Sequence, residues 1–287
     1  MSDNRIIWLA SFPKSGNTWM RAFLANYFIG GSKGLSINEL RRFTLGDIRA
    51  DFYDAAAGGK FELSTLEEYL ALRPKALRLI LNARDGTHFV KTHHQSVVIE
   101  GQPLVPPEIT AAAIYIMRNP FDVVPSYARH AGTGIDEAIE AMLDPTRLSA
   151  SPRGLFEVIG RWDKHIESWT ESQGLAMHVV RYEDLRDDPK AGFGKVFDFL
   201  KVRADPKQFA NALKLTRLEA LKKQEQKSGF IERPKEMSAF FHSGKVGGWR
   251  KTLSDQQIAT LHTAFEPTLR KFYPEIADET AAIAARA

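Results

Sequence analysis

The sequence predicts an α/β fold, a single domain in which helices flank a central, mostly parallel sheet. Short apolar runs rich in β-branched and aromatic residues alternate with longer segments of helical periodicity. Strands that alternate with helices in this way usually pair in parallel. No internal repeat or low-complexity linker divides the chain, so one domain over residues 1–287 is expected.

Four runs are expected to be strands, and these are residues 6–10, 88–93, 113–118 and 177–182. Apolar residues at helical spacing predict helices over residues 65–81 and 155–169. Asp188 before Pro189 marks a helix start for the segment through Leu200. Capping boxes are predicted at Thr216 and Ser254, the second opening a helix that runs to about Phe272. The glycine-containing stretches 30–34 and 55–59 are expected to be loops.

Composition narrows the function classes. The chain is 44% hydrophobic and 26% charged, as is ordinary for a soluble globular protein. It has no cysteine, which excludes disulfides, zinc–thiolate sites and a cysteine nucleophile. A net charge of +4 without a long basic run does not predict a nucleic-acid partner. The first apolar run is too short for a signal peptide or a membrane span, so we expect a cytoplasmic protein with no span.

The most informative segment is residues 11–19, which read Ser-Phe-Pro-Lys-Ser-Gly-Asn-Thr-Trp. A buried strand feeds a short Pro/Gly turn, and an amphipathic helix begins at once. The start of a helix offers unpaired backbone N–H groups and a positive dipole end, which suit a phosphate. Lys14 adds a charge, and three further side chains add donors. These are Ser15, Asn17 and Thr18.

This loop is not a Walker A motif, because its lysine comes before its only glycine. A magnesium-dependent phosphoryl-transfer enzyme also wants an aspartate at the end of an apolar strand. Here the strand at 113–118 ends in Arg118, and the strands at 88–93 and 177–182 also end in basic segments, Lys91-Thr92-His93 and Arg181-Tyr182. The carboxyl ends of parallel strands share one edge of the sheet. The sequence therefore favours an anion-binding cradle without a metal.

Four segments together resemble the cytosolic sulfotransferases. Residues 11–19 are similar to the family's 5′-phosphosulfate-binding loop. The segment Arg118-Asn-Pro-Phe-Asp-Val-Val-Pro-Ser126-Tyr is similar to its 3′-phosphate-binding segment. Residues 181–185 resemble the tyrosine-bearing strand end, and residues 241–250 the C-terminal phosphate-contacting loop. The four occur in family order over residues 6–273. The resemblance implies the sulfotransferase fold, which is like that of the P-loop nucleotide kinases.

The resemblance also implies the donor, 3′-phosphoadenosine 5′-phosphosulfate (PAPS), the product adenosine 3′,5′-bisphosphate, and no metal. Lys14 would stabilise the leaving phosphate. The other donor-binding residues implied are Ser15, Gly16, Asn17, Thr18, Trp19, Arg118, Ser126, Tyr182, Thr216 and Gly244. The family pattern has an arginine and a lysine where His242 and Ser243 stand, and Lys245 or Arg250 would have to supply the missing charge.

His93 matches the general base of the family's Lys-Thr-His segment, and Lys91 would add charge near the reacting atoms. Chemistry agrees, because an imidazole that titrates near neutral pH can take a proton from an alcohol. His94 stands next to it and is a second candidate for the base.

The acceptor is expected to be a small or lipid-like molecule with a hydroxyl group, or less favourably an amine. The expectation rests on five aromatic residues before residue 88, and these are Phe43, Phe52, Tyr53, Phe61 and Tyr69. Without a basic cluster there, an acidic glycan is not favoured. Residues 226–243 are expected to cover the pocket. The sequence leaves the oligomeric state open.

Two alternatives to a PAPS-dependent sulfotransferase remain at this point. One is a small-molecule or nucleotide kinase, which the loop and the missing aspartate disfavour. The other is a non-catalytic nucleotide-binding protein, against which the joint presence of Lys14, Lys91 and His93 argues.

Overall fold

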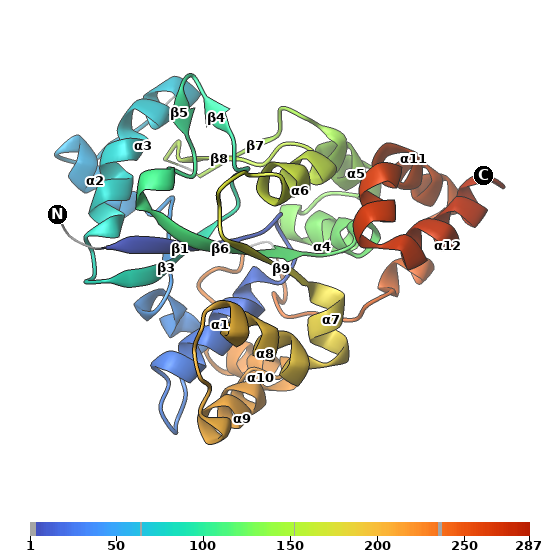
Figure 1. Ribbon diagram of the computed structural model, residues 1–287. Coiled ribbons are helices and arrows are strands. Elements are labelled where there is room, and N and C mark those ends of the chain that lie inside the picture. Colours follow the sequence, from blue (N-terminus) through green and yellow to red (C-terminus); the bar gives the residue numbers. More distant parts are fainter. Residues whose placement is uncertain (1–3, 64, 152, 235–236) are drawn as a thin grey trace.

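The computed structural model describes residues 4–63, 65–151, 153–234 and 237–287. Its centre is a five-stranded sheet in the order β2-β3-β1-β6-β9 (Figure 1). All four strand pairs are parallel. The strands are β1 (Arg5–Ala10), β2 (Leu45–Gly46), β3 (Thr87–Thr92), β6 (Thr110–Met117) and β9 (Met177–Arg181). The four predicted strands and their parallel pairing are confirmed.

The sheet is buried on both faces, because its central strands are apolar throughout. Ile6, Trp8 and Ala10 of β1 pack in one hydrophobic cluster, whereas Leu9 packs in the other. Strand β6 divides in the same way, with Tyr115 in the first cluster. This alternation follows from the two-residue period of a strand. It gives the sheet a layer of helices on each face.

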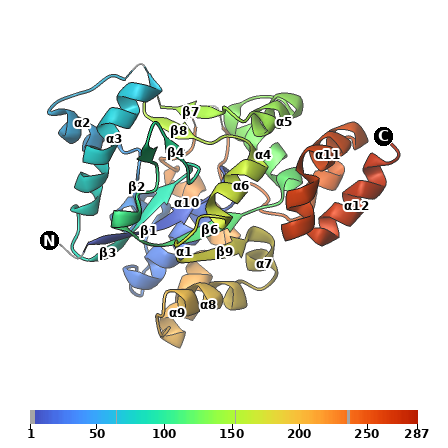
Figure 2. The same cartoon turned by 45° about the horizontal axis from the view of Figure 1, so that its top comes forward.

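Helices α3 (Leu66–Leu81), α5 (Ile135–Leu143) and α6 (Trp162–Thr170) cover one face, together with α4 (Pro120–Ala131) and α11 (Asp255–Phe272). Helices α1 (Asn17–Phe28), α8 (Pro189–Phe199) and α9 (Pro206–Leu215) cover the other (Figures 1 and 2). The remaining elements are η1 (Ile37–Arg42), α2 (Ala50–Ala57), β4 (Val98–Ile99), β5 (Gln102–Pro103), η2 (Pro107–Ile109), β7 (Leu148–Ala150), β8 (Phe156–Val158), α7 (Tyr182–Asp187), α10 (Leu218–Ser228), η3 (Gly248–Lys251) and α12 (Pro274–Ala284).

Several helix starts are as predicted. Thr65 caps α3 in a capping box, and Ser254 caps α11 in another. Asp188 accepts a hydrogen bond of 3.0 Å from the Ala191 N–H at the start of α8. In each case a side-chain oxygen takes up one of the N–H groups that the first turn leaves unpaired.

Three local predictions are wrong. Residues 155–169 do not form one helix, because β8 pairs with β7 as a hairpin and Gly160, at φ 60°, separates it from α6. Residues 55–57 belong to α2, which ends at Gly58. Thr216 does not begin a capping box, because its hydroxyl donates back to the Ala212 carbonyl at 2.7 Å. Strand pairing overrides the helical pattern in the first case, and local helix geometry decides the other two.

A buried polar network fixes the ends of β2 and β3. Arg73 of α3 donates to the Asp47 carboxylate at 2.9 Å, and both residues are almost fully buried. The Thr92 hydroxyl donates to the same carboxylate oxygen at 2.8 Å. Charges this deeply buried are tolerated only when paired and hydrogen-bonded. The network therefore holds the carboxyl end of β3, which carries Lys91 and His93, in one place.

Candidate active site at the carboxyl ends of the strands

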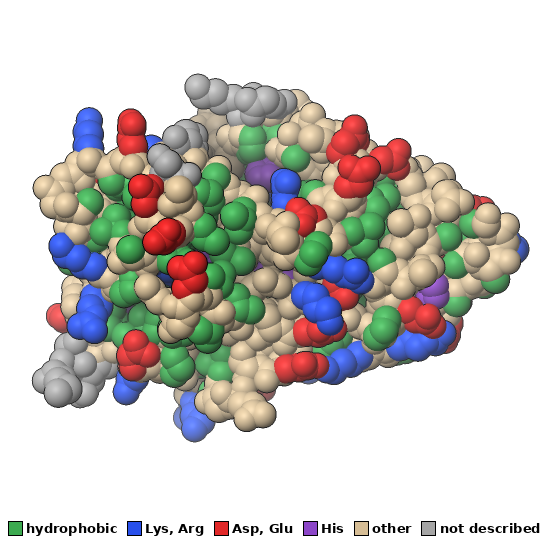
Figure 3. All heavy atoms as spheres, turned by 90° about the horizontal axis from the view of Figure 1, so that it is seen from above, with side chains coloured by type: hydrophobic (Ala, Val, Ile, Leu, Met, Phe, Trp, Pro, Cys, Tyr) green, Lys and Arg blue, Asp and Glu red, His purple; other side chains and the backbone are tan. Residues whose placement is uncertain are grey.

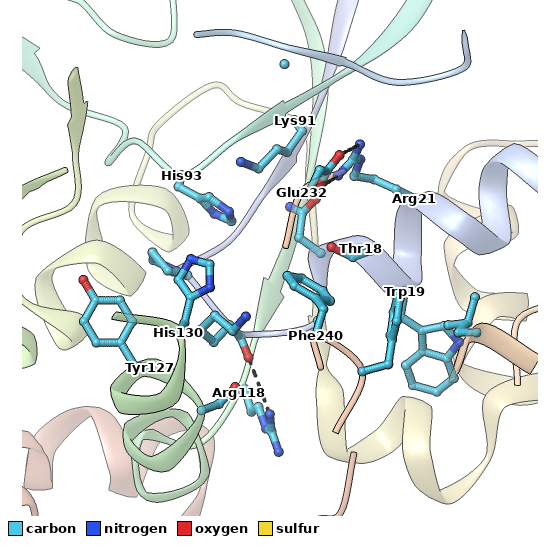
Figure 4. Close-up of a pocket in the computed structure, with 18 of the residues that line it drawn as sticks. Thr18, Trp19, Arg21, Lys91, His93, Arg118, Tyr127, His130, Glu232 and Phe240 are labelled. Atoms are coloured by element: carbon cyan, nitrogen blue, oxygen red, sulfur yellow. Dashed lines mark hydrogen bonds and ion pairs between the residues drawn. The ribbon is translucent and has the colours of Figure 1, made fainter. Parts of the chain in front are cut away.

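A cavity of about 950 Å³ opens at the carboxyl ends of β1, β3, β6 and β9. The chain passes from β1 to β3 on one side and returns to β6 on the other, so the sheet order reverses beside β1. Ligands of open α/β sheets bind at such a point. Figure 4 shows residues that line the cavity from several of these elements.

The loop after β1 meets the cavity just before helix α1 begins at Asn17. Gly16 has a φ of 105°, and a Cβ placed on it would lie 2.7 Å from the Tyr182 ring. Only glycine fits such a backbone this close to another side chain. The Asn17 amide donates to the Leu9 carbonyl at 2.9 Å and so braces the loop instead of facing a ligand. The first-turn N–H groups of α1 remain as anion donors.

Lys14 lines the cavity, and its Nζ lies 4.1 Å from the centre of the Phe240 ring. The pKa of its ammonium is lowered to about 8, chiefly by burial and then by the nearby Arg129 and Arg118. A lysine in this state gains from any anion that approaches it.

Arg118 joins the loop to the C-terminal segment. Its guanidinium donates to the Lys245 carbonyl at 3.0 Å and lies 4.3 Å over the Tyr182 ring. The Tyr182 hydroxyl donates to the Gly244 carbonyl at 3.0 Å. Residues far apart in the sequence thus form one wall of the cavity, and its exposed groups are cationic and aromatic.

His93 is held with one ring nitrogen toward the cavity. Its Nδ1 lies 2.7 Å from the Ser11 carbonyl, which can only accept, so Nδ1 carries the proton and Nε2 keeps a free lone pair. Burial holds the pKa of His93 well below its usual range, and Lys91 adds to this effect. Such an imidazole is neutral at pH 7 and can accept a proton at Nε2.

His94 is engaged elsewhere and does not line the cavity. Its Nδ1 accepts from the Val158 N–H at 3.0 Å, and its Nε2 lies 2.9 Å from the Tyr69 hydroxyl. Both ring nitrogens are therefore in use. The geometry favours His93 over His94 as a base, and His94 instead ties the β7–β8 hairpin to the end of β3.

Lys91 and Glu157 both line the cavity, with the Lys91 Nζ 3.7 Å from a Glu157 carboxylate oxygen. Burial raises the pKa of the Glu157 carboxyl, and Lys91 offsets only part of this shift. His130 of α4 faces the same space as Lys91 and His93 (Figure 4). Its pKa is lowered to about 4, chiefly by burial and then by Lys14.

The cavity brings together twelve of the thirteen site residues that the sequence predicts. These are Lys14, Gly16, Asn17, Thr18, Trp19, Lys91, His93, Arg118, Ser126, Tyr182, Thr216 and Gly244. Ser15 does not line it, because its side chain is fully buried behind the loop. Neither Lys245 nor Arg250 lines the cavity, and Arg250 is paired with Glu279, so neither residue replaces the charges missing at positions 242 and 243.

The aromatic residues expected around the acceptor are not there. Tyr53, Phe61 and Tyr69 are buried in a separate hydrophobic cluster, whereas Phe43 packs against two other clusters and Phe52 against a third. None of the five lines the cavity. The aromatic residues of α2 and α3 therefore pack in the protein core.

Sequence reasoning missed several lining residues, most of them charged. They are Arg21, Arg41, Arg49, Asp51, Arg129, His130, Arg147, Glu157, Arg186 and Glu232. Arg129 and His130 follow Ser126 by three and four residues on α4, so helical spacing could have placed them on its face. Arg21 follows Thr18 by three residues on α1, where the same spacing applies, and the others lie on short or irregular segments with no motif to signal them.

The segment after α10 covers the cavity, as expected for residues 226–243. We call residues 229–234 and 237–244 the covering segment. Its Phe240 and Phe241 N–H groups donate to the Glu225 carboxylate at 2.7 and 2.9 Å. Its Glu232 forms an ion pair with Arg21, drawn in Figure 4.

The described residues contain neither a cluster suited to a metal ion nor a helix suited to a membrane. No group of three or more His, Asp or Glu side chains among them is placed to hold a metal ion. None of the described helices is long and apolar enough to cross a membrane.

Comparison with known proteins adds independent findings. A family model described as "Sulfotransferase domain" matches residues 4–273. Flavonol 3-sulfotransferase from Flaveria bidentis is 24% identical over 275 residues, covering 92% of this chain and 81% of the relative. Rat sulfotransferase 1A1 is 26% identical over 277 residues, covering 91% and 83%. The crystal structure of mouse sulfotransferase SULT7A1 complexed with PAP superposes with a TM-score of 0.63 at 18% identity, covering 99% and 89%.

Proposed function

The chain belongs to the sulfotransferase family, and we propose that it transfers the sulfuryl group of PAPS to a hydroxyl group of a small acceptor. The observation that carries the proposal is the convergence of Lys14, Lys91 and the free Nε2 of His93 on one cavity. Family membership and the PAP bound by a relative of the same fold support the donor.

The residues present fit a donor with two anionic ends. The first turn of α1, the glycine at position 16 and Lys14 form a cradle for the 5′-phosphosulfate. Arg118, Ser126 and Gly244 lie on the wall where a 3′-phosphate would bind. Trp19, which packs edge-on against Tyr182, and Thr216 border the space for the adenine.

The donor supplies an activated sulfuryl group, and the chain's residues do the rest. His93 takes the acceptor hydroxyl proton at Nε2 while the acceptor oxygen bonds to sulfur. Lys14 stabilises the negative charge that collects on the 5′-phosphate oxygen as its bond to sulfur breaks. Lys91 adds positive charge on the acceptor side. Positioning and electrostatics supply most of the acceleration.

A transfer screen with radiolabelled PAPS and a panel of alcohols, phenols and amines tests this function. Lys14→Ala and His93→Ala are expected to lose transfer, whereas Lys251→Ala, an exposed lysine outside the cavity, is the matched control. His93→Ala should still bind adenosine 3′,5′-bisphosphate in calorimetry. Unimpaired transfer by His93→Ala would remove the base assignment, and binding without transfer to any acceptor would support a non-catalytic role.

A further inference from the structure

The acceptor side of the cavity is charged. We use this name for the walls contributed by residues 41–51, by Lys91 and His93, and by the β7–β8 hairpin with Arg147 before it. Its cations are Arg41, Arg49, Lys91 and Arg147, and its carboxylates are Asp51 and Glu157. Cations outnumber carboxylates there by two among the described residues.

Once the ion pairs are taken into account, the surplus positive charge lies on two arginines, Arg41 and Arg147. Arg49 forms an ion pair with Asp51, and Lys91 lies 3.7 Å from Glu157. Burial raises the pKa of the Glu157 carboxyl, and Lys91 offsets part of this shift. No described carboxylate lies within ion-pair distance of the Arg41 or Arg147 guanidinium.

Arg147 is the better placed of the two. Arg41 is exposed at the rim, whereas the Arg147 Nε is buried and has no hydrogen-bond partner among the described residues. Its backbone is fixed, because its carbonyl accepts from the Ile159 and Gly160 N–H groups at 2.9 Å each. A buried donor without a partner is costly, and a planar guanidinium fork matches carboxylate, phosphate and sulfate groups.

On the face that Figure 3 shows, Lys and Arg side chains are interspersed with Asp and Glu. The donor's own anionic groups have other partners, since Lys14 and Arg118 lie on the wall formed by β1, β6 and the covering segment.

We propose that the acceptor carries an anionic group in addition to its hydroxyl, and that Arg147 binds this group. The proposal rests on the proposed function and narrows its substrate class from small hydroxyl compounds in general to hydroxy-carboxylates, or to hydroxyl compounds that bear a phosphate or sulfate. A charge-assisted hydrogen bond of this kind is worth enough to give about tenfold or greater preference over a neutral analogue.

Acceptor pairs that differ only in charge test the proposal. The phenol series is 4-hydroxyphenylacetate, 4-hydroxyphenylacetamide and tyramine, and the alkanol pair is 6-hydroxyhexanoate with its amide. Two readouts are taken for each compound, kcat/KM for sulfuryl transfer from PAPS and calorimetric binding to the protein saturated with adenosine 3′,5′-bisphosphate. The variants are Arg147→Gln and, as a matched control, Arg203→Gln, an exposed arginine outside the cavity.

The wild type and Arg203→Gln should favour each anion over its amide by about tenfold or more, and tyramine should be poorest. In Arg147→Gln the ratio should fall toward one, while binding of adenosine 3′,5′-bisphosphate is retained. Equal values for anion and amide, a preference for tyramine, or no binding of either anion would overturn the proposal. An unchanged ratio in Arg147→Gln would overturn the role of Arg147. Failure of the proposed function is distinct, because then no compound is sulfated whatever its charge.

Discussion

Arg21 of α1 and Glu232 of the covering segment form a bidentate ion pair, with both N–O distances 2.8 Å. Arg21 is 3% exposed, so nearly all of its charge is balanced by this one carboxylate. The pair joins the helix that begins at the anion cradle to the segment that covers Lys14. The free energy of this ion pair therefore affects how often the covering segment moves and opens the cavity.

Glu232→Gln should loosen the covering segment. The substitution keeps the shape of the side chain but removes a charge-assisted pair worth about 1.5–3 kcal/mol. Amide hydrogen exchange within residues 229–234 and 237–241 should become about tenfold faster or more, with helix α3 unchanged. Glu167→Gln removes an exposed pair with Lys164 and should change nothing. Equal exchange in Glu232→Gln and the wild type would show that the pair does not hold the segment.

Gly16→Ala should impair donor binding beyond the cost of its backbone conformation. Gly16 and Gly174 both have positive φ, and alanine at either is strained by about 1–2 kcal/mol. Only at Gly16 would the added Cβ also meet Tyr182, whereas space around Gly174 is open. Calorimetry should show about tenfold weaker binding of adenosine 3′,5′-bisphosphate in Gly16→Ala and little change in Gly174→Ala. Similar affinities in the two variants would contradict the close-approach argument.

Asp47→Ala should be strongly destabilising. It leaves the Arg73 guanidinium buried with its charge unbalanced, which typically costs about 3–5 kcal/mol. The Thr92 hydroxyl loses its acceptor as well. Urea unfolding should show this loss, with Glu266→Ala, which removes an exposed partner of Arg270, within about 0.5 kcal/mol of the wild type. A small effect of Asp47→Ala would mean that water or relaxation compensates Arg73.

Binding of adenosine 3′,5′-bisphosphate should take up protons above pH 8. Burial and the neighbouring cations lower the pKa of Lys14 to about 8 in the free protein, so the ammonium loses its proton there as the pH rises. An anionic ligand favours the charged form and raises that pKa, so affinity should fall as the pH rises through 8. Titration calorimetry in buffers of different ionisation enthalpy measures the uptake. Lys14→Ala should abolish it, and uptake that persists in this variant would assign it to another group.

The lowered pKa of Lys14 also makes the free energy of unfolding depend on pH. The Lys14 pKa of about 8 lies below the value of 10.5 for a free lysine, so the unfolded chain binds more protons between these values. The cost of burying the ammonium therefore disappears as the pH rises through this window. A lysine-free variant at this position, Lys14→Met, should lose that part of the pH dependence in thermal unfolding.

The sheet was predictable from sequence because its strands are buried on both faces. Residues 6–10 and 113–117 are apolar without interruption, which leaves few other structures open to them. The helix predicted over 155–169 failed for the opposite reason. Its spacing of apolar residues is also produced by a hairpin followed by a short helix, and a backbone bond to Arg147 decides between them.

The donor wall was predictable because most of its residues lie in four compact motifs, three of which stand at strand ends. The acceptor side was not, because Arg49, Arg147 and Glu157 come from short elements that pack together only in three dimensions. The aromatic residues Tyr53 and Tyr69 show the limit of composition, since a hydrophobic side chain fits a core as well as a pocket. Whether such a residue contacts a ligand depends on whether its side of the helix faces the pocket or the core.

The β7–β8 hairpin is attached to the molecule mainly by backbone groups, and it lines the acceptor side of the cavity with side chains. The hairpin is bound to the rest of the molecule through the Val158 N–H on His94 and the Val158 carbonyl, which accepts from the Gln95 N–H at 2.8 Å. The side chains of Arg147 and Ser149 take no part in that attachment, whereas Glu157 lies 3.7 Å from the Lys91 Nζ of β3. A library at positions 147 and 149 is therefore expected to change the choice of acceptor while the donor-binding residues stay unchanged.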